Sequence, residues 1–289
     1  MPTKVEKDAV TGQETTGHEW DGIKELNTPL PKWWLYVLYA TIAFSVLWWL
    51  LYPSWPYGSG YLSGLLGYSQ RMALEGDLAE AEAERAGVVS RLAAADLEQI
   101  ADDPELMSVA FAGGQAAFAD NCAPCHGLGG AGQAHYPTLA DDAWIWGGTL
   151  DAIHQTILYG IRNENPDSRF NEMPRFGVDQ LLDRGQIEDV AEYVLSLSGH
   201  AEDPEAVDRG ATIFAEQCSA CHGEQGEGLQ DLGAPALNDE IWLYGGTREE
   251  IIAQIWNPQQ GVMPPWVNRL DEPTIKSLVV YVHSLGGGQ

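Results

Sequence analysis

The sequence predicts an all-α chain, in which one N-terminal transmembrane helix is followed by two tandem copies of one small helical domain. Three observations support this prediction. Residues 33–52 form an uncharged stretch, three blocks of sequence recur in the same order further along the chain, and the four cysteines fall into two identical Cys-x-x-Cys-His patterns. The length of 289 residues is consistent with about two domains.

The composition excludes several classes of protein. The chain has 42 acidic and 15 basic side chains, a formal net charge of −27. Nucleic-acid binding requires a positive surface that displaces phosphate counterions, so no nucleic-acid partner is expected. A hydrophobic content of 45% with 11 tryptophans is too apolar for a disordered chain. Four cysteines are too few for a small scaffold held by disulfides.

The uncharged segment 33–52 is long enough to cross a membrane, because a helix of this length spans about 30 Å. Tryptophan pairs near both of its ends fit the aromatic belt of a membrane interface. The alternatives are a buried core helix or a signal peptide, but a signal peptide has a shorter apolar core and a small-residue cleavage site. Four lysines lie in the N-terminal segment 1–32, and the first cation after the span is Arg71. This asymmetry weakly indicates a cytoplasmic N-terminus.

Residues 53–106 are predicted to be a linker that contains an acidic helical stretch at 69–101. Apolar side chains recur there every three or four residues, as expected for a helix. One interpretation is a solvated spacer helix or helix pair, and the other is a docking face for a partner subunit.

The rest of the chain is an internal repeat, with one copy at 107–200 and the other at 205–287. The matching blocks are 114–122 with 210–218, 137–149 with 235–247, and 193–199 with 281–287. Each copy begins and ends with a helical pattern. We expect close helix crossings at two equivalent glycines and aromatic packing beside them: Gly114 and Gly210, with Phe118, Phe214, Tyr193 and Tyr281.

Cys-x-x-Cys-His is the attachment signal for c-type haem. Residues i and i+3 lie on one face of a helical turn, so two thiols can bond to one porphyrin while the following histidine reaches its iron. A zinc site would need both cysteine pairs at one metal, and a thioredoxin-like redox pair would follow a strand in a βαβ unit. We therefore expect two covalently bound haem c groups, held by Cys122, Cys125, Cys218 and Cys221, with His126 and His222 as iron ligands.

A six-coordinate haem also needs a distal ligand, usually methionine or histidine. Met173 and Met263 each follow a haem motif and directly precede a proline, which restricts the backbone before it. We expect both to ligate iron. The simple pairing joins Met173 to the first haem and Met263 to the second, although a swapped pairing is sterically conceivable. His135 and His154 are alternative ligands without a counterpart in the second repeat, so surface or satisfied roles are favoured.

The environment of each haem can also be predicted from the repeat. An axial histidine needs a hydrogen-bond acceptor for its second ring nitrogen. The carbonyl groups of Pro137 and Pro235 occupy equivalent positions and are the natural acceptors. Leu139 and Leu237 are expected to pack on the haem rings.

The chain resembles a known family. The two repeats are similar to class I cytochromes c, with Gly and Phe before the haem motif, Pro-x-Leu after it, Met-Pro, and a C-terminal helix containing Tyr. Residues 18–34 read HEWDGIKELNTPLPKWW, and YPSWP follows the span at 52–56. Together these features resemble CcoP/FixP, the dihaem subunit of cbb3-type cytochrome c oxidases.

The resemblance implies a role in aerobic or microaerobic respiration. Haem c is attached on the periplasmic side of the bacterial inner membrane, so the haem domains would be periplasmic and the N-terminus cytoplasmic. The subunit would accept electrons from a donor cytochrome c and relay them to a monohaem cytochrome c subunit and then to the haem–copper subunit that reduces oxygen. No ligand set for haem b or copper is apparent here, so the oxygen chemistry would belong to another chain.

Elementary chemistry also favours an electron relay. Two coordinatively filled haems leave no open position for a substrate, so outer-sphere electron transfer remains. Past residue 52 the chain has 11 basic and 36 acidic residues, and such a field would speed encounter with a basic donor. The alternatives are a stand-alone membrane-anchored dihaem carrier, a dihaem cytochrome c peroxidase and a haem-based gas sensor.

Overall fold

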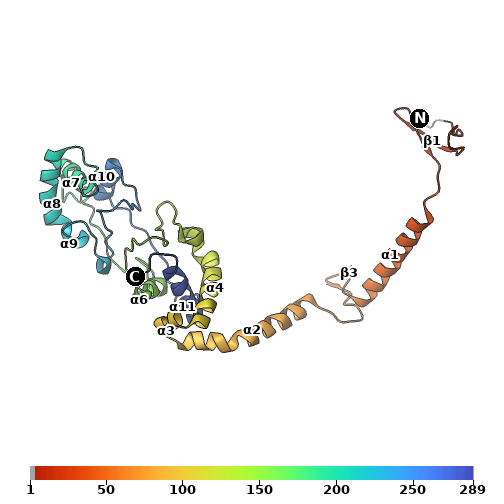
Figure 1. The fold of residues 1–289 in the computed structure, drawn as a ribbon, viewed down its shortest axis with the longest axis horizontal. Coiled ribbons are helices and arrows are strands. Elements are labelled where there is room, and N and C mark those ends of the chain that lie inside the picture. Colours follow the sequence, from red (N-terminus) through yellow and green to blue (C-terminus); the bar gives the residue numbers. More distant parts are fainter. Residues whose placement is uncertain (1–3, 289) are drawn as a thin grey trace. The chain divides into compact units, whose positions relative to one another are not determined.

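The computed structural model describes residues 4–288, and the chain is mostly helical (Figure 1). Contacts divide it into two units, Met1–Glu84 and Arg85–Gln289. Helix α2 (Gln70–Ala94) begins in the first unit and ends in the second. With α3 (Leu97–Asp102), it accounts for the helical stretch predicted at 69–101.

The first unit contains helix α1 (Lys32–Leu51), which agrees with the predicted span to within one residue at each end. None of its residues is buried. Among the described residues, it is the one helix that is both long and apolar enough to cross a membrane. The helix ends where Tyr52 adopts an extended conformation, and the following Pro53 lacks the N–H that would continue it.

Two small antiparallel hairpins flank α1, which the sequence analysis did not predict. Strands β1 (Thr15–Trp20) and β2 (Ile23–Leu26) are joined by Asp21 and Gly22, with φ angles of 48° and 86°. Positive φ at both positions defines a type I′ turn, for which Asp-Gly is a preferred sequence. The second hairpin pairs β3 (Pro56–Tyr57) with β4 (Gly60–Tyr61).

The second unit is built from helices and connecting loops. After α3 come α4 (Pro104–Asn121), α5 (Ala123–His126), the 3₁₀ helix η1 (Leu128–Gly130), α6 (Leu150–Tyr159), α7 (Arg184–Leu197), α8 (Pro204–Gln217), α9 (Ser219–His222), the 3₁₀ helix η2 (Gln230–Leu232), α10 (Arg248–Trp256) and α11 (Glu272–His283).

The internal repeat is visible in the way these helices begin. Asp103 and Asp203 cap α4 and α8, and each is followed by a proline at the first helical position. Thr149 and Thr247 cap α6 and α10 through their side-chain hydroxyl groups. Equivalent sequence positions therefore start equivalent helices in the two repeats.

The helices form two packed bodies, and these bodies differ from the predicted segments 107–200 and 205–287. In the first body, α4, α5 and α6 pack with α11, the last helix of the second repeat. In the second body, α8, α9 and α10 pack with α7, the last helix of the first repeat. The repeats thus exchange their C-terminal helices. A short connection between α7 and α8 makes them natural antiparallel neighbours, which is one physical reason for the exchange.

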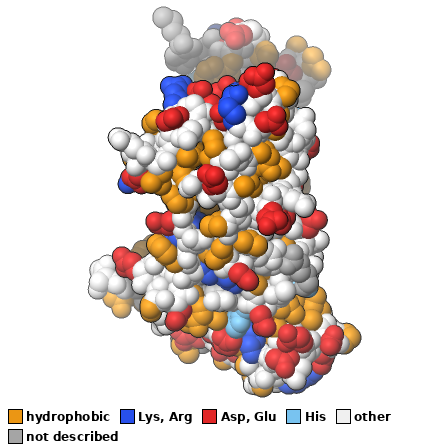
Figure 2. All heavy atoms as spheres, turned by 90° about the vertical axis from the view of Figure 1, so that its left-hand side faces the viewer, with side chains coloured by type: hydrophobic (Ala, Val, Ile, Leu, Met, Phe, Trp, Pro, Cys, Tyr) orange, Lys and Arg blue, Asp and Glu red, His pale blue; other side chains and the backbone are white. Residues whose placement is uncertain are grey.

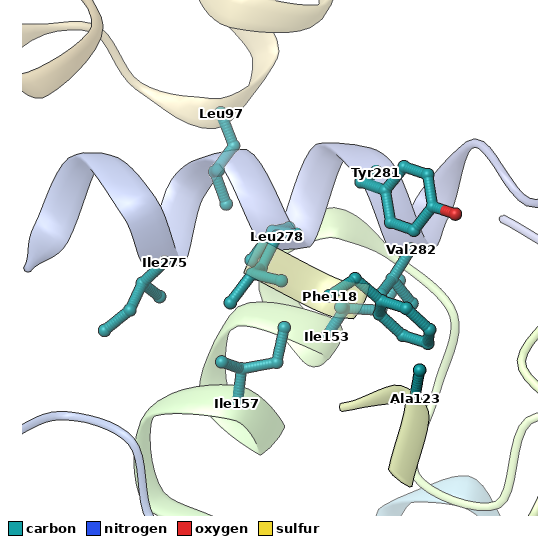
Figure 3. Close-up of a cluster of buried hydrophobic side chains, with 10 residues drawn as sticks. Leu97, Phe118, Ala123, Ile153, Ile157, Ile275, Leu278, Tyr281 and Val282 are labelled. Carbon is teal, nitrogen blue, oxygen red and sulfur yellow. The ribbon is translucent and has the colours of Figure 1, made fainter. Parts of the chain in front are cut away.

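The expected glycine crossings are present in this exchanged form. A Cβ atom on Gly114 would overlap the carbonyl oxygen of Ser277 in α11, and one on Gly210 would overlap that of Asp189 in α7. Beside them Phe118 packs against Tyr281, with ring centroids 5.3 Å apart (Figure 3), and Tyr193 packs against Phe214 at 4.9 Å. The close approach of the backbones explains why glycine is required at both crossings.

A third apolar cluster joins the end of α2 and helices α3 and α4 to α11. Its buried members are Leu92, Ile100, Leu106, Ala110 and Val280. The ammonium group of Lys276 in α11 also donates hydrogen bonds to the carbonyl oxygens of Ala93 and Ala95, at 2.8 and 2.7 Å. The C-terminal helix therefore holds the end of α2 against the first body.

Candidate haem sites

Each Cys-x-x-Cys-His motif forms a single helical turn, α5 in the first body and α9 in the second. The carbonyl oxygen of Cys122 accepts hydrogen bonds from the N–H groups of Cys125 and His126, at 3.1 and 2.9 Å. In the second motif the carbonyl oxygen of Cys218 accepts the equivalent hydrogen bonds from the N–H groups of Cys221 and His222, at 3.1 and 3.0 Å. This places both thiols and the histidine of each motif on one compact turn, and none of the four cysteines forms a disulfide.

The histidine of each motif is oriented by a backbone carbonyl, as expected. Nδ1 of His126 lies 3.1 Å from the carbonyl oxygen of Pro137, and Nδ1 of His222 lies 2.9 Å from that of Pro235. Since a carbonyl only accepts, Nδ1 carries the proton and Nε2 keeps its lone pair. Burial lowers the pKa of both histidines, against the smaller opposing effect of these carbonyl groups. A neutral imidazole is the form that binds a metal.

The thiols do not have the character of a redox pair. Burial, aided by the neighbouring Cys125, raises the pKa of Cys122 to about 11. Burial and Cys221 raise the pKa of Cys218 to about 11 in the same way. Reactive dithiols instead have lowered pKa values. The two pairs also lie against different hydrophobic cores, so they do not converge on one zinc ion.

A cavity of about 680 Å³ is lined by residues of both bodies, and its volume is within the size range of cofactor pockets. Cys218, Cys221, His222 and Met173 of the second site line it, together with residues of the loop 131–145 that follows the first haem motif. The walls include the apolar side chains of Phe176, Val190, Phe214, Leu237 and Trp242. A largely apolar chamber that contains two thiols, a neutral imidazole and a thioether fits a covalently attached haem.

The two methionines pack in the exchanged arrangement. Met173 lies against the core of the second body, and Met263 lies against the core of the first. Met263 exchanges two backbone hydrogen bonds with Ile161, both of 3.0 Å, and its carbonyl oxygen accepts a third from Asn163 at 2.8 Å. The amide of Gln260 donates to the carbonyl oxygen of Met173 at 3.3 Å. Each methionine is therefore held by the repeat that does not contain it.

Some of the remaining residues at the sites were predicted from the sequence, and others were not. Leu139 and Leu237 pack against the first and second cores, respectively. The sequence analysis did not assign Trp242, Tyr244 or Arg162 to a site, yet all three line the cavity described above. Trp242 and Tyr244 have the counterparts Trp144 and Trp146 in the first repeat. Their recurrence before a Gly-Gly-Thr sequence was the available signal.

The two histidines considered as alternative ligands have other contacts. His135 adopts a left-handed conformation and packs against the ring of Tyr244, with centroids 5.7 Å apart, and both residues line the cavity. Nε2 of His154 lies 3.6 Å from a carboxylate oxygen of Glu272.

Two helical bodies, each with a Cys-x-x-Cys-His turn and a methionine against its core, define a protein with two cytochrome c domains. The family profiles described as "N-terminal domain of cytochrome oxidase-cbb3, FixP", "Cytochrome c" and "Cytochrome C oxidase, cbb3-type, subunit III" match residues 12–59, 111–198 and 205–282. The chain belongs to the CcoP/FixP family of cbb3-type cytochrome c oxidase subunits. It therefore carries covalently bound haem c, functions in electron transfer and has partners within the oxidase.

Curated relatives match over nearly the whole chain. Identity is 49% to the cbb3-type cytochrome c oxidase subunit CcoP of Azospirillum sp. (strain B510), covering 98% of both chains. It is 51% to the FixP subunit of Azorhizobium caulinodans, covering 98% of this chain and 96% of the relative. It is 47% to CcoP of Cereibacter sphaeroides, with both chains fully covered.

Proposed function

We propose that this chain accepts electrons from a donor cytochrome c and passes them to a monohaem cytochrome c subunit, which delivers them to the haem–copper subunit that reduces oxygen. The observation that carries the proposal is the pair of equivalent sites, each with an oriented neutral histidine and a methionine packed against the same core. Bound haem c supplies one-electron redox chemistry. The histidine and the methionine of each site would hold the haem iron, so that no position at the iron would be left for a substrate.

The ligand sets follow the packed bodies rather than the order of the sequence. For the first haem we assign Cys122, Cys125 and His126, with Met263 as the distal ligand. For the second we assign Cys218, Cys221 and His222, with Met173 as the distal ligand. The packing of Met263 against the first core and of Met173 against the second supports this pairing.

The difference between α7 and α11 gives independent support for the exchanged pairing. Glu192 in α7 is fully buried, forms an ion pair with Arg248 and accepts hydrogen bonds from the N–H groups of Glu202 and Asp203, at 3.0 and 3.3 Å. The equivalent residue of α11 is Val280, which lies in the third apolar cluster. If the helices were interchanged, the carboxylate would enter that cluster without a partner, which is strongly unfavourable.

The membrane topology is also part of the proposal. The N-terminal segment 1–32 would be cytoplasmic, α1 would cross the bacterial inner membrane once, and the linker 53–106 and both haem domains would be periplasmic. The lysines before α1 and the absence of cations between α1 and Arg71 support this orientation through the positive-inside rule.

The ligand assignment can be tested in a background that retains one haem. The double variant Cys218→Ala/Cys221→Ala, purified within the oxidase, should contain only the first haem c. In this background Met263→Ala should abolish the absorption band of methionine-ligated ferric haem and lower the midpoint potential, because the iron loses its thioether ligand. Met173→Ala is the matched control and should leave the band unchanged.

The opposite outcome, in which Met173→Ala removes the band and Met263→Ala does not, would establish the pairing by sequence order. Preparations of the unmodified oxidase in which this chain carries no haem c, or in which reduced donor cytochrome c transfers no electrons to it, would refute the proposed function itself.

A further inference from the structure

Arg162 occupies a special position between α6 and Met173. It is one of the few non-glycine residues with a positive φ, 50°, and its side chain is half-buried. Its Nε donates to the carbonyl oxygen of Gly261 at 2.8 Å, and its Nη1 donates to that of Asn171 at 3.2 Å. These bonds hold the guanidinium group where the two chain segments cross between the bodies. They use two of its five N–H donors.

Arg162 lines the cavity that the second haem site shares with the loop 131–145. Cys218, His222 and Met173 line the same cavity, whereas Cys122, His126 and Met263 do not, so Arg162 borders the space assigned to the second haem. Tyr244 is a further member of this wall, and its hydroxyl accepts a hydrogen bond of 2.9 Å from the N–H of Gly261. The arginine is therefore part of an ordered polar corner in an otherwise largely apolar chamber.

This cation has no carboxylate partner among the residues that the structure describes, although the chain is strongly acidic. Burial lowers the pKa of Arg162, while the charges of Tyr244 and Glu172 oppose this effect. A partly desolvated cation is unfavourable without a counter-charge. An anionic group bound in the cavity that Arg162 lines would supply this counter-charge.

The second repeat has a neutral residue at the corresponding position. Counted from the capping residues Thr149 and Thr247, Arg162 corresponds to Gln260, whose amide donates to the carbonyl oxygen of Met173. An amide at this position therefore serves the structural purpose of joining the crossing segments. The positive charge of Arg162 is additional to that purpose and requires its own explanation.

We propose that Arg162 is the counter-charge for a propionate group of the second haem. The inference rests on the proposed assignment of that haem to Cys218, Cys221 and His222. Haem carries two propionates, and the fork of a guanidinium group matches a carboxylate in shape and charge. A cation fixed at this place also disfavours the ferric form, which has the greater positive charge. Arg162 therefore raises the midpoint potential of the second haem relative to the first.

The test compares three variants of the full oxidase. Arg162→Gln introduces the amide of the other repeat, Arg162→Lys keeps the charge, and Arg175→Gln removes an exposed arginine that pairs with Asp179 outside the cavity. The midpoint potential of each haem c is measured, with the second haem identified by its loss in the Cys218→Ala/Cys221→Ala variant. Redox-difference infrared spectra with ¹³C-labelled propionates report on the carboxylate directly.

We expect Arg162→Gln to lower the potential of the second haem and to shift its labelled propionate bands. The potential should be largely kept in Arg162→Lys and unchanged in Arg175→Gln. Unchanged propionate bands in Arg162→Gln, or a shift confined to the first haem, would overturn the inference. So would loss of the methionine–iron band in both Arg162 variants, since that would assign the residue to the crossing alone. Absence of the second haem from the unmodified oxidase would instead refute the proposed function.

Discussion

At the scale of single residues, the haem sites depend on atoms that contribute geometry rather than chemistry. The carbonyl oxygens of Pro137 and Pro235 select the histidine tautomer that leaves Nε2 available. Proline is suited to this position because its fixed φ angle limits the movement of the chain that carries the carbonyl. Gly114 and Gly210 also contribute geometry: because they lack side chains, the helices that support the sites can approach each other closely.

The close crossing of α4 and α11 can be tested by comparing alanine substitutions at Gly114 and at its neighbour Gly113. In Gly114→Ala the new methyl group would overlap the backbone of Ser277 and the Cβ of Tyr281, so we expect a loss of about 1–3 kcal/mol in stability. In Gly113→Ala the methyl group would lie 3.6 Å from the hydroxyl oxygen of Ser277, an ordinary contact. This control should be neutral or stabilising by up to about 1 kcal/mol, because alanine favours the helix.

Urea titration of the purified oxidase, followed through the methionine–iron band of the first haem, measures the difference between these variants. Equal midpoints for Gly113→Ala and Gly114→Ala would show that the α4–α11 crossing is looser than the structure indicates.

At the scale of the helices, the repeats preserve the form of each element but differ in their partners. The haem turns, the glycine crossings and the helical patterns at the start and end of each repeat were predicted from the sequence. The capping residues and the helices α6 and α10, which also recur at equivalent positions, were not predicted. The exchange of α7 and α11 was not predictable in the same way. Both helices carry the Tyr that packs beside the glycine, and both fit either crossing by pattern alone.

The residues that distinguish these helices become informative only together with their surroundings. Glu192 is an unremarkable acidic residue in the sequence, and Val280 is one of many apolar residues. Glu192 is significant because it pairs with Arg248 and accepts a hydrogen bond from the α7–α8 connection. Val280 is significant because it packs in the cluster with Leu92 and Ile100. The hairpin at Asp21 had a local signal in its Asp-Gly sequence, but the sequence analysis treated residues 1–32 only as an N-terminal segment and made no prediction of its structure.

The buried carboxylate of α7 should be far more important than an exposed one on the same helix. In Glu192→Leu, Arg248 and two N–H groups lose their acceptor, and we expect a loss of about 2–4 kcal/mol. The lower part of this range is favoured because Arg248 is 37% exposed and can be hydrated. Glu188→Gln removes only an exposed pair with Arg184, so its effect should stay below about 0.5 kcal/mol.

Urea titration followed at the second haem measures both effects. A Glu192→Leu midpoint equal to that of Glu188→Gln would contradict the role of Glu192 in holding α7 to the second body.

At the scale of the whole molecule, the exchange joins the two haem bodies by two chain crossings. The segment after α6 leads into the second body, and the segment after α10 returns to the first. The two bodies are therefore tethered by two chain segments rather than one, which limits how far they can separate. This suits a relay, because the rate of electron transfer falls steeply with distance.

The charge of the molecule leads to the final prediction, which concerns the donor. Figure 2 shows many Asp and Glu side chains on one face, with fewer Lys and Arg side chains among them. Beyond residue 52 there are 36 acidic and 11 basic residues. Such a field steers a basic cytochrome toward the subunit, and salt screens it over about 8–10 Å.

We expect the bimolecular rate constant for a basic donor to fall about tenfold or more between 10 and 200 mM salt. Stopped-flow oxidation of the reduced donor measures this rate, with an acidic cytochrome c as the control whose rate should rise or stay level. A rate for the basic donor that is independent of salt would place its docking site on another subunit.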